Sequence, residues 1–413
     1  MSMKSIRIRS AGALALCFGL LGFGLLAFVP PAIAIDPIKI GVIASPSAGP
    51  QWQDQQRREG LQIAVKIIND AGGTLGRPIE LAFVDVPGPP DSAGAAVEKL
   101  ITQDKVTAVL GGTDSAAALA GVEVAHRHKV PYIAGARAQA IAGKLYPEVF
   151  IPVISNSRIA AAIAEAMKGL GVKRAVAFTE NTDPGIELAN LLAHQLNSNE
   201  LGIHYSFETL DPAAKDFASA LQPHTANRPD AIIQLMRSPA AYGLITQLRQ
   251  QGLAPSASTW LYDGAGLVED PAFWQNVGDA ARGMLVLSGY HPKMTLSDVG
   301  REVADAYRAK ANQEPTTVVL QAADSLLMVA EAIKSGGSSE PEAVAKALEN
   351  LKWTGTRGKM TFSAEKDGDK YHQWLDAPVV TFQITAVKQP LGETTLIQAP
   401  GQPFDASRVT KPN

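Results

Sequence analysis

The stretch that decides the fold is IAVKIINDAGGTLGRPIEL, residues 63–81. Apolar residues recur at helical spacing on one face of this region: Leu61, Ala64, Val65 and Ile68. The pattern stops at the pair Gly72-Gly73, which can adopt the positive φ that commonly ends a helix. A turn around Pro78 then begins an apolar strand. The stretch therefore predicts a helix that packs on a sheet, as in an α/β layer.

The same alternation of strand and helix continues along the chain. Strand patterns lie at 38–44, 79–86, 106–110, 130–134, 174–178, 231–235 and 283–288. Helical patterns lie at 54–71, 91–103, 115–128, 157–170, 185–199, 213–223, 239–251, 298–312, 318–335 and 340–351. Short connections between them predict doubly wound parallel sheets with helices on both faces. A gap near residues 150–152 separates two such sets, so we expect two α/β lobes.

The N-terminus has the pattern of an export signal. Basic residues, namely Lys4, Arg7 and Arg9, precede an uncharged apolar run from residue 11 to residue 29. Pro30-Pro31 breaks that run, and Ala32-Ile33-Ala34 has the small residues of a cleavage site. Residues 1–34 are therefore predicted to be a cleaved signal peptide, which places the protein in the periplasm. The alternative is an uncleaved membrane anchor, because the apolar run is nearly long enough to span a bilayer.

Charge and cysteine content narrow the class of protein. Without residues 1–34 the chain keeps 34 basic and 40 acidic side chains, a formal charge of −6 with no basic block. Binding to nucleic acid needs clustered Lys and Arg, so that class is not expected. The only cysteine, Cys17, leaves with the signal peptide. The exported chain then has no disulfide and depends on burial of its core.

Seven segments in the same order resemble the leucine/isoleucine/valine-binding type of periplasmic substrate-binding protein, which serves ABC importers. The resemblance as a whole runs from about Ile38 to Ala386. They are 38–50, 69–78 (NDAGGTLGRP), 100–109 (LITQDKVTAV), 229–233 (PDAII), 248–253 (LRQQGL), 278–283 (GDAARG) and 353–362 (WTGTRGKMTF). Each segment is weak alone, and the order of the seven carries the resemblance.

The resemblance implies the type 1 periplasmic binding protein fold, with two lobes joined by three chain crossings. Such lobes close on a small ligand by hinge motion, and the protein then delivers the ligand to ABC permease subunits in the inner membrane. The expected boundaries are 38–152 plus 287–355 for the N-terminal lobe and 153–286 plus 356–388 for the C-terminal lobe. Residues 389–413 lack periodicity and are expected to form a loosely attached extended tail.

The residues after the strand at 106–110 suit an anionic ligand group. They read Gly111-Gly112-Thr113-Asp114-Ser115 and open a helix, whose N-terminus offers free N–H groups. The glycines permit close approach of the backbone, and Thr113 and Ser115 add hydroxyl donors. The alternative is helix capping, because Thr, Asp and Ser are all common N-cap residues.

Further ligand contacts are implied by the resemblance. Trp52 follows the first strand, where related proteins can place an aromatic ring over the ligand; it could equally cover the edge of the lobe. Asp263-Gly264 is similar to the acidic–glycine pair that holds a ligand ammonium by a charge-assisted bond. The alternative for Asp263 is a turn in which its side chain bonds the local backbone.

Three departures from the family pattern bear on the ligand. The segment 131–138 is similar to a family stretch that usually ends in serines and a threonine. Here it ends in Ala136, Arg137 and Ala138, with Ala138 at the threonine position. Asp183-Pro184-Gly185 lacks the tyrosine usual between its Asp and Gly, and Arg237 stands in a segment that lacks a second aromatic residue. Two arginines would suit a ligand with an extra carboxylate. Alternatively, both are solvated or pair with Asp114 or Asp183.

Catalysis finds little support in the sequence. There is no HExxH motif, no Cys–His cluster, no nucleophile elbow and no GxGxxG after the first strand, so neither a metal nor a cofactor is expected. The leading hypothesis is a periplasmic solute-binding component of an ABC importer that captures an amino acid or small carboxylate. A ligand-sensing regulatory receptor of the same fold and, less favoured, an exported α/β enzyme stay open.

Overall fold

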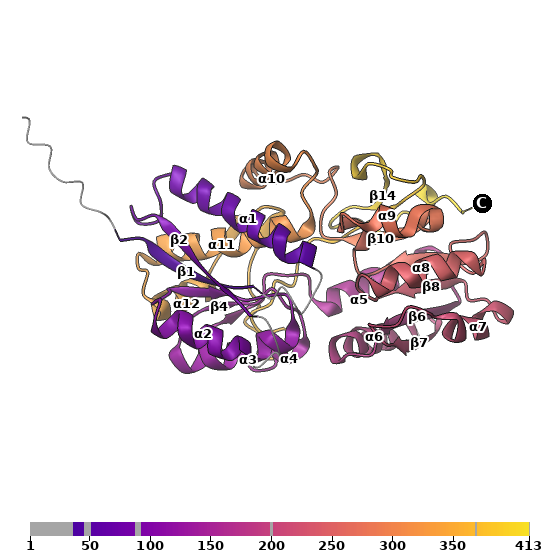
Figure 1. Cartoon of the computed structure of the whole chain (residues 1–413), viewed down its shortest axis with the longest axis horizontal. Coiled ribbons are helices and arrows are strands. Elements are labelled where there is room, and N and C mark those ends of the chain that lie inside the picture. The colour runs from indigo at the N-terminus through magenta and orange to yellow at the C-terminus, as the bar shows by residue number, and fades with distance from the viewer. Residues whose placement is uncertain (1–35, 45–50, 87–91, 199–200, 368–369, 413) are drawn as a thin grey trace, which may run out of the picture. The chain divides into compact units, whose positions relative to one another are not determined.

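The structure is a computed structural model that describes residues 36–44, 51–86, 92–198, 201–367 and 370–412. The predicted signal peptide, residues 1–34, lies outside the described residues. Residues 36–413 form one compact unit built on two large sheets (Figure 1). We call each sheet with its helices a lobe. Within the described ranges, no helix has the length and apolar character needed to cross a membrane.

The first lobe contains a five-stranded parallel sheet in the order β2-β1-β3-β4-β5. Its strands are β1 (Ile38–Ala44), β2 (Ile79–Asp85), β3 (Ala108–Leu110), β4 (Tyr132–Ile133) and β5 (Val149–Phe150). The helices α1 (Gln51–Asp70) and α11 (Thr317–Gly336) cover one face; α2 (Ser92–Thr102) and α3 (Ser115–His128) cover the other (Figure 1). Successive side chains of β1 point to opposite faces of the sheet. Val42 packs in the core under α1 and α11, and its neighbour Ile43 packs in the core under α2 and α3.

The second lobe contains a seven-stranded sheet in the order β14-β13-β10-β9-β8-β6-β7. Five strands are parallel: β6 (Arg174–Glu180), β7 (His204–Leu210), β8 (Ala231–Gln234), β9 (Trp260–Asp263) and β10 (Leu285–Ser288). Its helices are α5 (Asn156–Gly169), α6 (Asp183–Leu196), α7 (Ala218–Ala226), α8 (Ala240–Gln250) and α9 (Phe273–Val277). Ala177 packs in the same core as α5 and α6, whereas its neighbour Phe178 packs in the core of α7 and α8. The predicted α/β fold class, with helices on both faces of parallel sheets, is confirmed.

Both lobes repeat one winding order. In the first sheet the chain turns outward to β2 and then crosses to β3 on the other side of β1; in the second it turns to β7 and then crosses to β8. The order therefore reverses between β1 and β3 and again between β6 and β8. In open α/β sheets, ligands bind beyond the carboxyl ends of the strands at such reversals.

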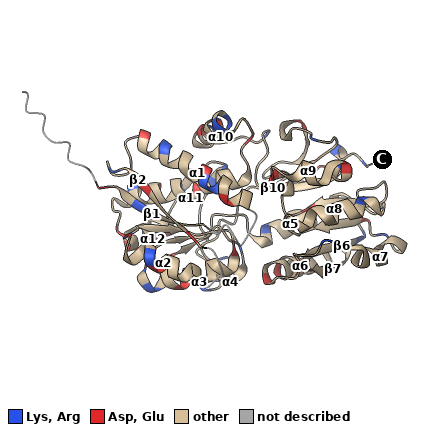
Figure 2. Cartoon of the chain, in the orientation of Figure 1, with Lys and Arg blue, Asp and Glu red and all other residues tan. Residues whose placement is uncertain are grey.

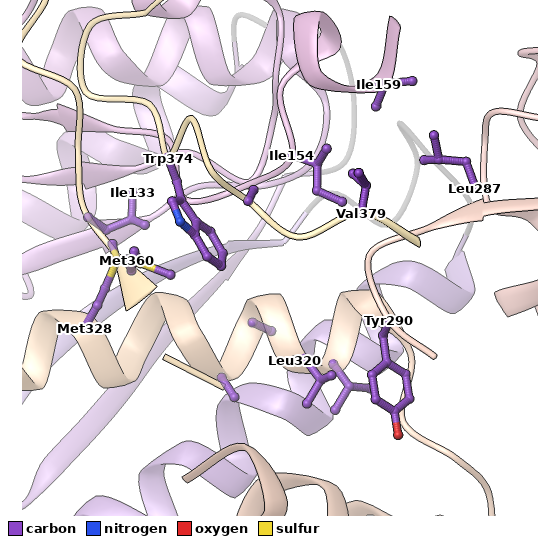
Figure 3. Packing of buried hydrophobic residues seen from close by; sticks show 14 of the residues in the cluster. Ile133, Ile154, Ile159, Leu287, Tyr290, Leu320, Met328, Met360, Trp374 and Val379 are labelled. Carbon is purple, nitrogen blue, oxygen red and sulfur yellow. The ribbon is translucent and has the colours of Figure 1, made fainter. Parts of the chain in front are cut away.

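The chain passes three times between the two sheets: from β5 to α5, from β10 to α10 (Asp298–Ala311), and back to β13 (Val380–Gln383). Apolar side chains from all three passages, Ile154, Tyr290 and Val379, belong to one buried core (Figure 3). The last passage comes later than the expected boundary at residue 356. Gln373 forms a bridge with Ile151, next to β5, and the ring of His372 lies 3.0 Å from the carbonyl of Val149, so these residues stay with the first lobe.

The first lobe is completed by a distant part of the chain. Besides α11 it takes α10, α12 (Pro341–Glu349) and the hairpin β11 (Trp353–Gly355)–β12 (Gly358–Met360). Close contact between α1 and α11 is possible because position 60 is glycine: a Cβ there would lie 2.3 Å from the carbonyl oxygen of Val319 and 3.0 Å from the Cβ of Ala322. Gly60 thus lets the two backbones approach.

The expectation of a loosely attached tail at 389–413 is wrong. Residues Thr395–Gln398 form β14, which pairs antiparallel with β13 at the edge of the second sheet. Further along, the amide of Thr410 donates to Gln383 at 2.8 Å. A four-residue strand is too short to show periodicity in the sequence, which explains the error.

His291 ties this tail to the second crossing. It is fully buried; its Nδ1 accepts from the amide of Lys293 at 3.1 Å, and its Nε2 lies 2.9 Å from the hydroxyl of Thr394. That hydroxyl in turn donates to the carbonyl of Leu391. Since Nδ1 accepts, Nε2 carries the proton and the ring is neutral. Burial, followed by the charge of Lys293, lowers the pKa of His291 to about 4.

Replacing Gly60 by alanine should destabilise the protein. The added methyl group would push α1 away from the backbone of α11, and overpacking of this kind costs about 1–3 kcal/mol. Gly94→Ala is the matched control, because it also lies in a helix that faces another helix but its Cβ would meet nothing closer than 3.4 Å. Urea unfolding monitored by circular dichroism measures both variants. Equal stability of the two would contradict the tight contact at Gly60.

The neutral His291 predicts a loss of stability in acid. Below about pH 6.5 the unfolded chain takes up a proton that the folded chain resists until about pH 4, so stability falls as pH drops through that window. His291→Gln should therefore show a shallower decline of unfolding free energy between pH 6.5 and 4 than the original protein. The control is His204→Gln, which replaces an exposed histidine on β7. Parallel pH curves for the original and His291→Gln proteins would refute this role.

Candidate functional site

All nine residues predicted from the sequence lie at or just beyond carboxyl ends of strands. In the first lobe these are Trp52 after β1, Thr113 and Ser115 after β3, and Ala136 and Arg137 after β4. In the second lobe they are Asp183 after β6, Arg237 after β8, and Asp263 and Gly264 at the end of β9. Basic and acidic residues alternate over the ribbon without a region of one sign (Figure 2). Each charge at these strand ends is therefore best characterised by its nearest partners.

Arg57 of α1 fixes the reversal between β1 and β3. Its buried guanidinium donates to the carbonyls of Ile43 at 2.7 Å, Leu110 at 2.9 Å and Gly111 at 2.6 Å. Burial lowers its pKa to about 10, so Arg57 remains charged at neutral pH. One cation thus holds two strand ends together. Sequence reasoning missed it, because a basic residue on a helix ordinarily points into solvent.

The segment after β3 is shaped by Tyr132 and Asp114. A Cβ at Gly111 would lie 2.3 Å from the hydroxyl oxygen of Tyr132, so glycine is required there by packing. Asp114 caps α3 by accepting from the amide of Ala117 at 2.8 Å. Capping is therefore the role of Asp114. The hydroxyls of Thr113, which is exposed, and Ser115, which is half-buried, make no hydrogen bond within the described residues.

In the second lobe an ion pair spans the reversal between β6 and β8. Glu180, the last residue of β6, is almost buried and accepts from the amide of Arg237 at 2.8 Å. The Nη2 of Arg237 lies 3.0 Å from the same carboxylate. Arg237 thus pairs with Glu180 and not with Asp114 or Asp183. The position of Glu180 at a strand end is a sequence signal that could have identified it. Asp183 is exposed in the first turn of α6 and forms no ion pair within the described ranges.

Arg137 lies where the two lobes approach each other. Two residues further on, the amide of Gln139 donates to Glu187 of α6 at 3.0 Å, a contact between lobes. Glu187 also accepts from Asn156 at 2.6 Å. Although water reaches Arg137, the surrounding protein lowers its pKa, mainly by desolvation and then by the positive charge of Arg237, while Glu187 acts in the opposite direction. Arg137 and Arg237 are therefore electrostatic neighbours across the lobes.

Asp263 occupies the turn that the sequence offered as its alternative role. Its carboxylate is fully buried and accepts three hydrogen bonds, from the amides of Ala265 and Leu267 and from the side chain of Gln234. Burial raises its pKa to about 7, against the effect of these bonds. Gly264 donates its amide to Gln234, and a Cβ there would lie 2.7 Å from Leu235. Contact of Asp263 with a ligand ammonium therefore stays a prediction that this geometry does not favour.

A second contact between lobes involves Glu269, which sequence reasoning missed. It accepts from the amide of Thr317 at 3.0 Å and from its hydroxyl at 2.6 Å, so it caps the first turn of α11 from the second lobe. Ser288, at the end of β10, donates to the same carboxylate at 2.6 Å. Burial raises the pKa of Glu269. The contact ties the second crossing to the first lobe.

Trp52 and Ala136 contribute in different ways. Trp52 is half-buried in the first turn of α1, and its indole Nε1 is buried without a hydrogen-bond partner in the described structure. It is thus an unused donor near the end of β1. Ala136 is 2 % exposed and offers no polar side-chain group.

Two hollows on the protein lie away from these residues. One, of roughly 470 Å³, is lined by the segment 361–365 with Leu375 and Asp376, and the other, of roughly 360 Å³, lies along α8. Neither includes a predicted site residue. Among the described residues, no group of three or more His, Cys, Asp or Glu side chains is placed to hold a metal ion.

Comparison with known proteins agrees with this geometry. Residues 37–384 match the family model described as periplasmic binding protein. The chain is 28 % identical over 350 residues to the leucine-, isoleucine-, valine-, threonine- and alanine-binding protein of Pseudomonas aeruginosa, covering 82 % of this chain and 89 % of that one. It is 28 % identical to the Leu/Ile/Val-binding protein BraC3 of Rhizobium johnstonii, covering 83 % and 91 %.

Solved structures show the same fold. The substrate-binding protein LivJ of Streptococcus pneumoniae, in complex with isoleucine, has a TM-score of 0.75 at 26 % identity, covering 87 % of this chain and all of that one. A solute-binding protein of Rhodopseudomonas palustris in complex with 3,4-dihydroxybenzoic acid has a TM-score of 0.74 at 22 % identity, covering 91 % and 99 %. The predicted family is confirmed: this chain belongs to the periplasmic binding proteins and has their type 1 fold.

Proposed function

We propose that this protein is the solute-binding component of an ABC importer and captures an amino acid or a related small carboxylate. The ligand binds in a cleft between the carboxyl ends of the two sheets, and the lobes close on it by hinge motion. ABC permease subunits in the inner membrane receive the ligand. The family match over residues 37–384 is the observation that carries this proposal.

The winding of the two sheets supports the place of binding. Each sheet reverses its strand order once, and the predicted residues gather at the strand ends on both sides of these reversals. Closure around three chain crossings needs contacts that can form and break between lobes. The bond between the carboxylate of Glu187 and the amide of Gln139 is a contact of this kind.

The groups available at the strand ends suit a carboxylate. Thr113, Ser115 and Trp52 offer donors that are not used within the described structure, and Arg137 adds a positive charge. Charge-assisted bonds from such donors are about twice as strong as neutral ones. The ligand role of these residues is part of the proposal.

Export supports the proposed location. Residues 1–34 carry the pattern of a cleaved signal peptide, and solute capture before membrane transport takes place in the periplasm. The family to which the chain belongs is periplasmic. We therefore propose that the mature protein begins near residue 35.

A thermal-shift screen tests the function. The protein is produced from its full coding sequence, stripped of carried-over ligand by partial unfolding, and refolded. The panel contains aliphatic and polar amino acids, amides, dicarboxylates and aromatic acids. A ligand at about a hundred times its dissociation constant adds roughly 2.7 kcal/mol, which raises the melting temperature by several degrees. At least one amino acid or small carboxylate should do so.

The control in that screen is a panel of neutral solutes of similar size, such as sugars and alcohols, which should give no shift. The intact mass of the purified protein reports in parallel whether residues 1–34 have been removed. If the neutral solutes stabilise the protein and no carboxylate does, the proposed ligand class is wrong.

A further inference from the structure

Acidic side chains at the strand ends are almost all engaged within the protein. Asp263 is buried with three hydrogen bonds, and Glu180 is paired with Arg237. Glu187 accepts from Gln139 and from an asparagine amide. A ligand ammonium needs a carboxylate that faces it and is not already saturated by other donors. These three carboxylates do not meet that requirement.

The remaining acidic groups are no better placed. Asp114 is committed to capping α3, and Glu269 is committed to Thr317 and Ser288. Asp183 has no partner in the described structure. It lies in the first turn of α6, where the positive end of the helix dipole already stabilises its negative charge. Among the described residues, none of these six carboxylates is therefore a strong anchor for an ammonium group.

Two hydrogen-bond donors near the strand ends, unlike the carboxylates, have no partner within the described residues. The guanidinium of Arg137 forms no ion pair and no hydrogen bond with any described residue. Its five N–H groups lie at the boundary between the lobes, two residues before the contact of Gln139 with Glu187. The indole N–H of Trp52, in the first turn of α1, is buried and also without a partner in the described ranges.

Arg137 is also held in an unfavourable setting when no anion is bound. It is partly desolvated, and Arg237 on the other lobe adds like charge. Arg237 is neutralised by Glu180, whereas Arg137 has only the more distant charge of Glu187, whose oxygens are occupied by other donors. A carboxylate placed between the lobes would satisfy the guanidinium through paired hydrogen bonds and relieve the repulsion as the lobes close.

We propose that the ligand is a small carboxylic acid without an ammonium group, and that Arg137 binds its carboxylate. This rests on the proposed function, because it names the ligand class of the same site. Oxo acids, hydroxy acids and aliphatic or aromatic acids meet this description.

Matched ligand pairs test the proposal by isothermal titration calorimetry on stripped protein. Leucine is compared with 4-methyl-2-oxopentanoate and 4-methylpentanoate, and phenylalanine with phenylpyruvate and 3-phenylpropanoate. Within each set the carbon skeleton is constant and only the amino group changes. We expect at least one acid without an amine to bind at least tenfold more tightly than its amino acid.

Variants assign the contact. Arg137→Gln removes the charge from an exposed side chain and should weaken binding of the acid by roughly a hundredfold, the effect expected for a lost bidentate charge-assisted pair. Arg137→Lys keeps the charge but loses the two parallel N–H donors of the guanidinium. Its affinity for the acid should therefore lie between those of the original protein and of Arg137→Gln. The control is Arg127→Gln, an exposed arginine in the last turn of α3, at the far end from the site, which should not change binding.

The outcomes separate the two proposals. Tight binding of amino acids with weaker binding of their deaminated partners would overturn the ligand class and leave the proposed function in place. Failure of both classes to bind, with the protein folded by circular dichroism, would count against the proposed function as well. Binding of an acid that Arg137→Gln and Arg137→Lys leave unchanged would overturn the assignment to Arg137.

Discussion

Packing of α11 against α1 is the contact on which the rest of the architecture depends. The two helices come from opposite parts of the chain, and the whole second lobe apart from its last strands lies between them in sequence. On one face of the first sheet, α1 therefore lacks its neighbouring helix until the chain has returned from the second lobe. Gly60 permits this packing by letting the backbone of α1 approach Val319. The second crossing, from β10 to α10, is the one that this packing requires.

The same return of the chain brings polar groups to the boundary between the lobes. The first turn of α11 places Thr317 where Glu269 of the second lobe can accept from it, and buried Asp324 further along α11 binds Thr356 and Arg357. Arg357 in turn donates to the carbonyl of Gly289 in the second crossing. Two separate polar contacts thus fasten α11 to the second crossing: Glu269 with Thr317, and Asp324 with Arg357, which binds Gly289. Removing one partner of a buried pair such as Asp324 and Arg357 costs much stability, because the other charge stays buried.

Much of this fold could be predicted from the sequence, because burial on one face leaves a period. The helix at residues 318–335 and the strand at 38–44 were recognisable for that reason, and the structure has them at Thr317–Gly336 and Ile38–Ala44. The strand His204–Leu210 was missed although Tyr205 and Phe207 alternate with polar residues, because the strand lies at a sheet edge and has only two apolar side chains facing the core before Leu210. Tertiary partners are harder still. Nothing near Arg57 in the sequence shows that it would bind carbonyls of two strands. For Asp263 the sequence offered both a ligand contact and a local turn, and could not decide between them.

The fate of Asp263 shows why resemblance transfers a fold more safely than a ligand. An acidic residue before a glycine satisfies the family pattern whether its carboxylate faces the opposing lobe or folds back onto the backbone. Here the amides of Ala265 and Leu267 and the side chain of Gln234 all donate to the carboxylate, which is buried in its own turn. The proposal that Arg137 binds the carboxylate of the ligand therefore rests on a guanidinium that has no partner among the described residues, and not on the acidic–glycine pair of the family pattern.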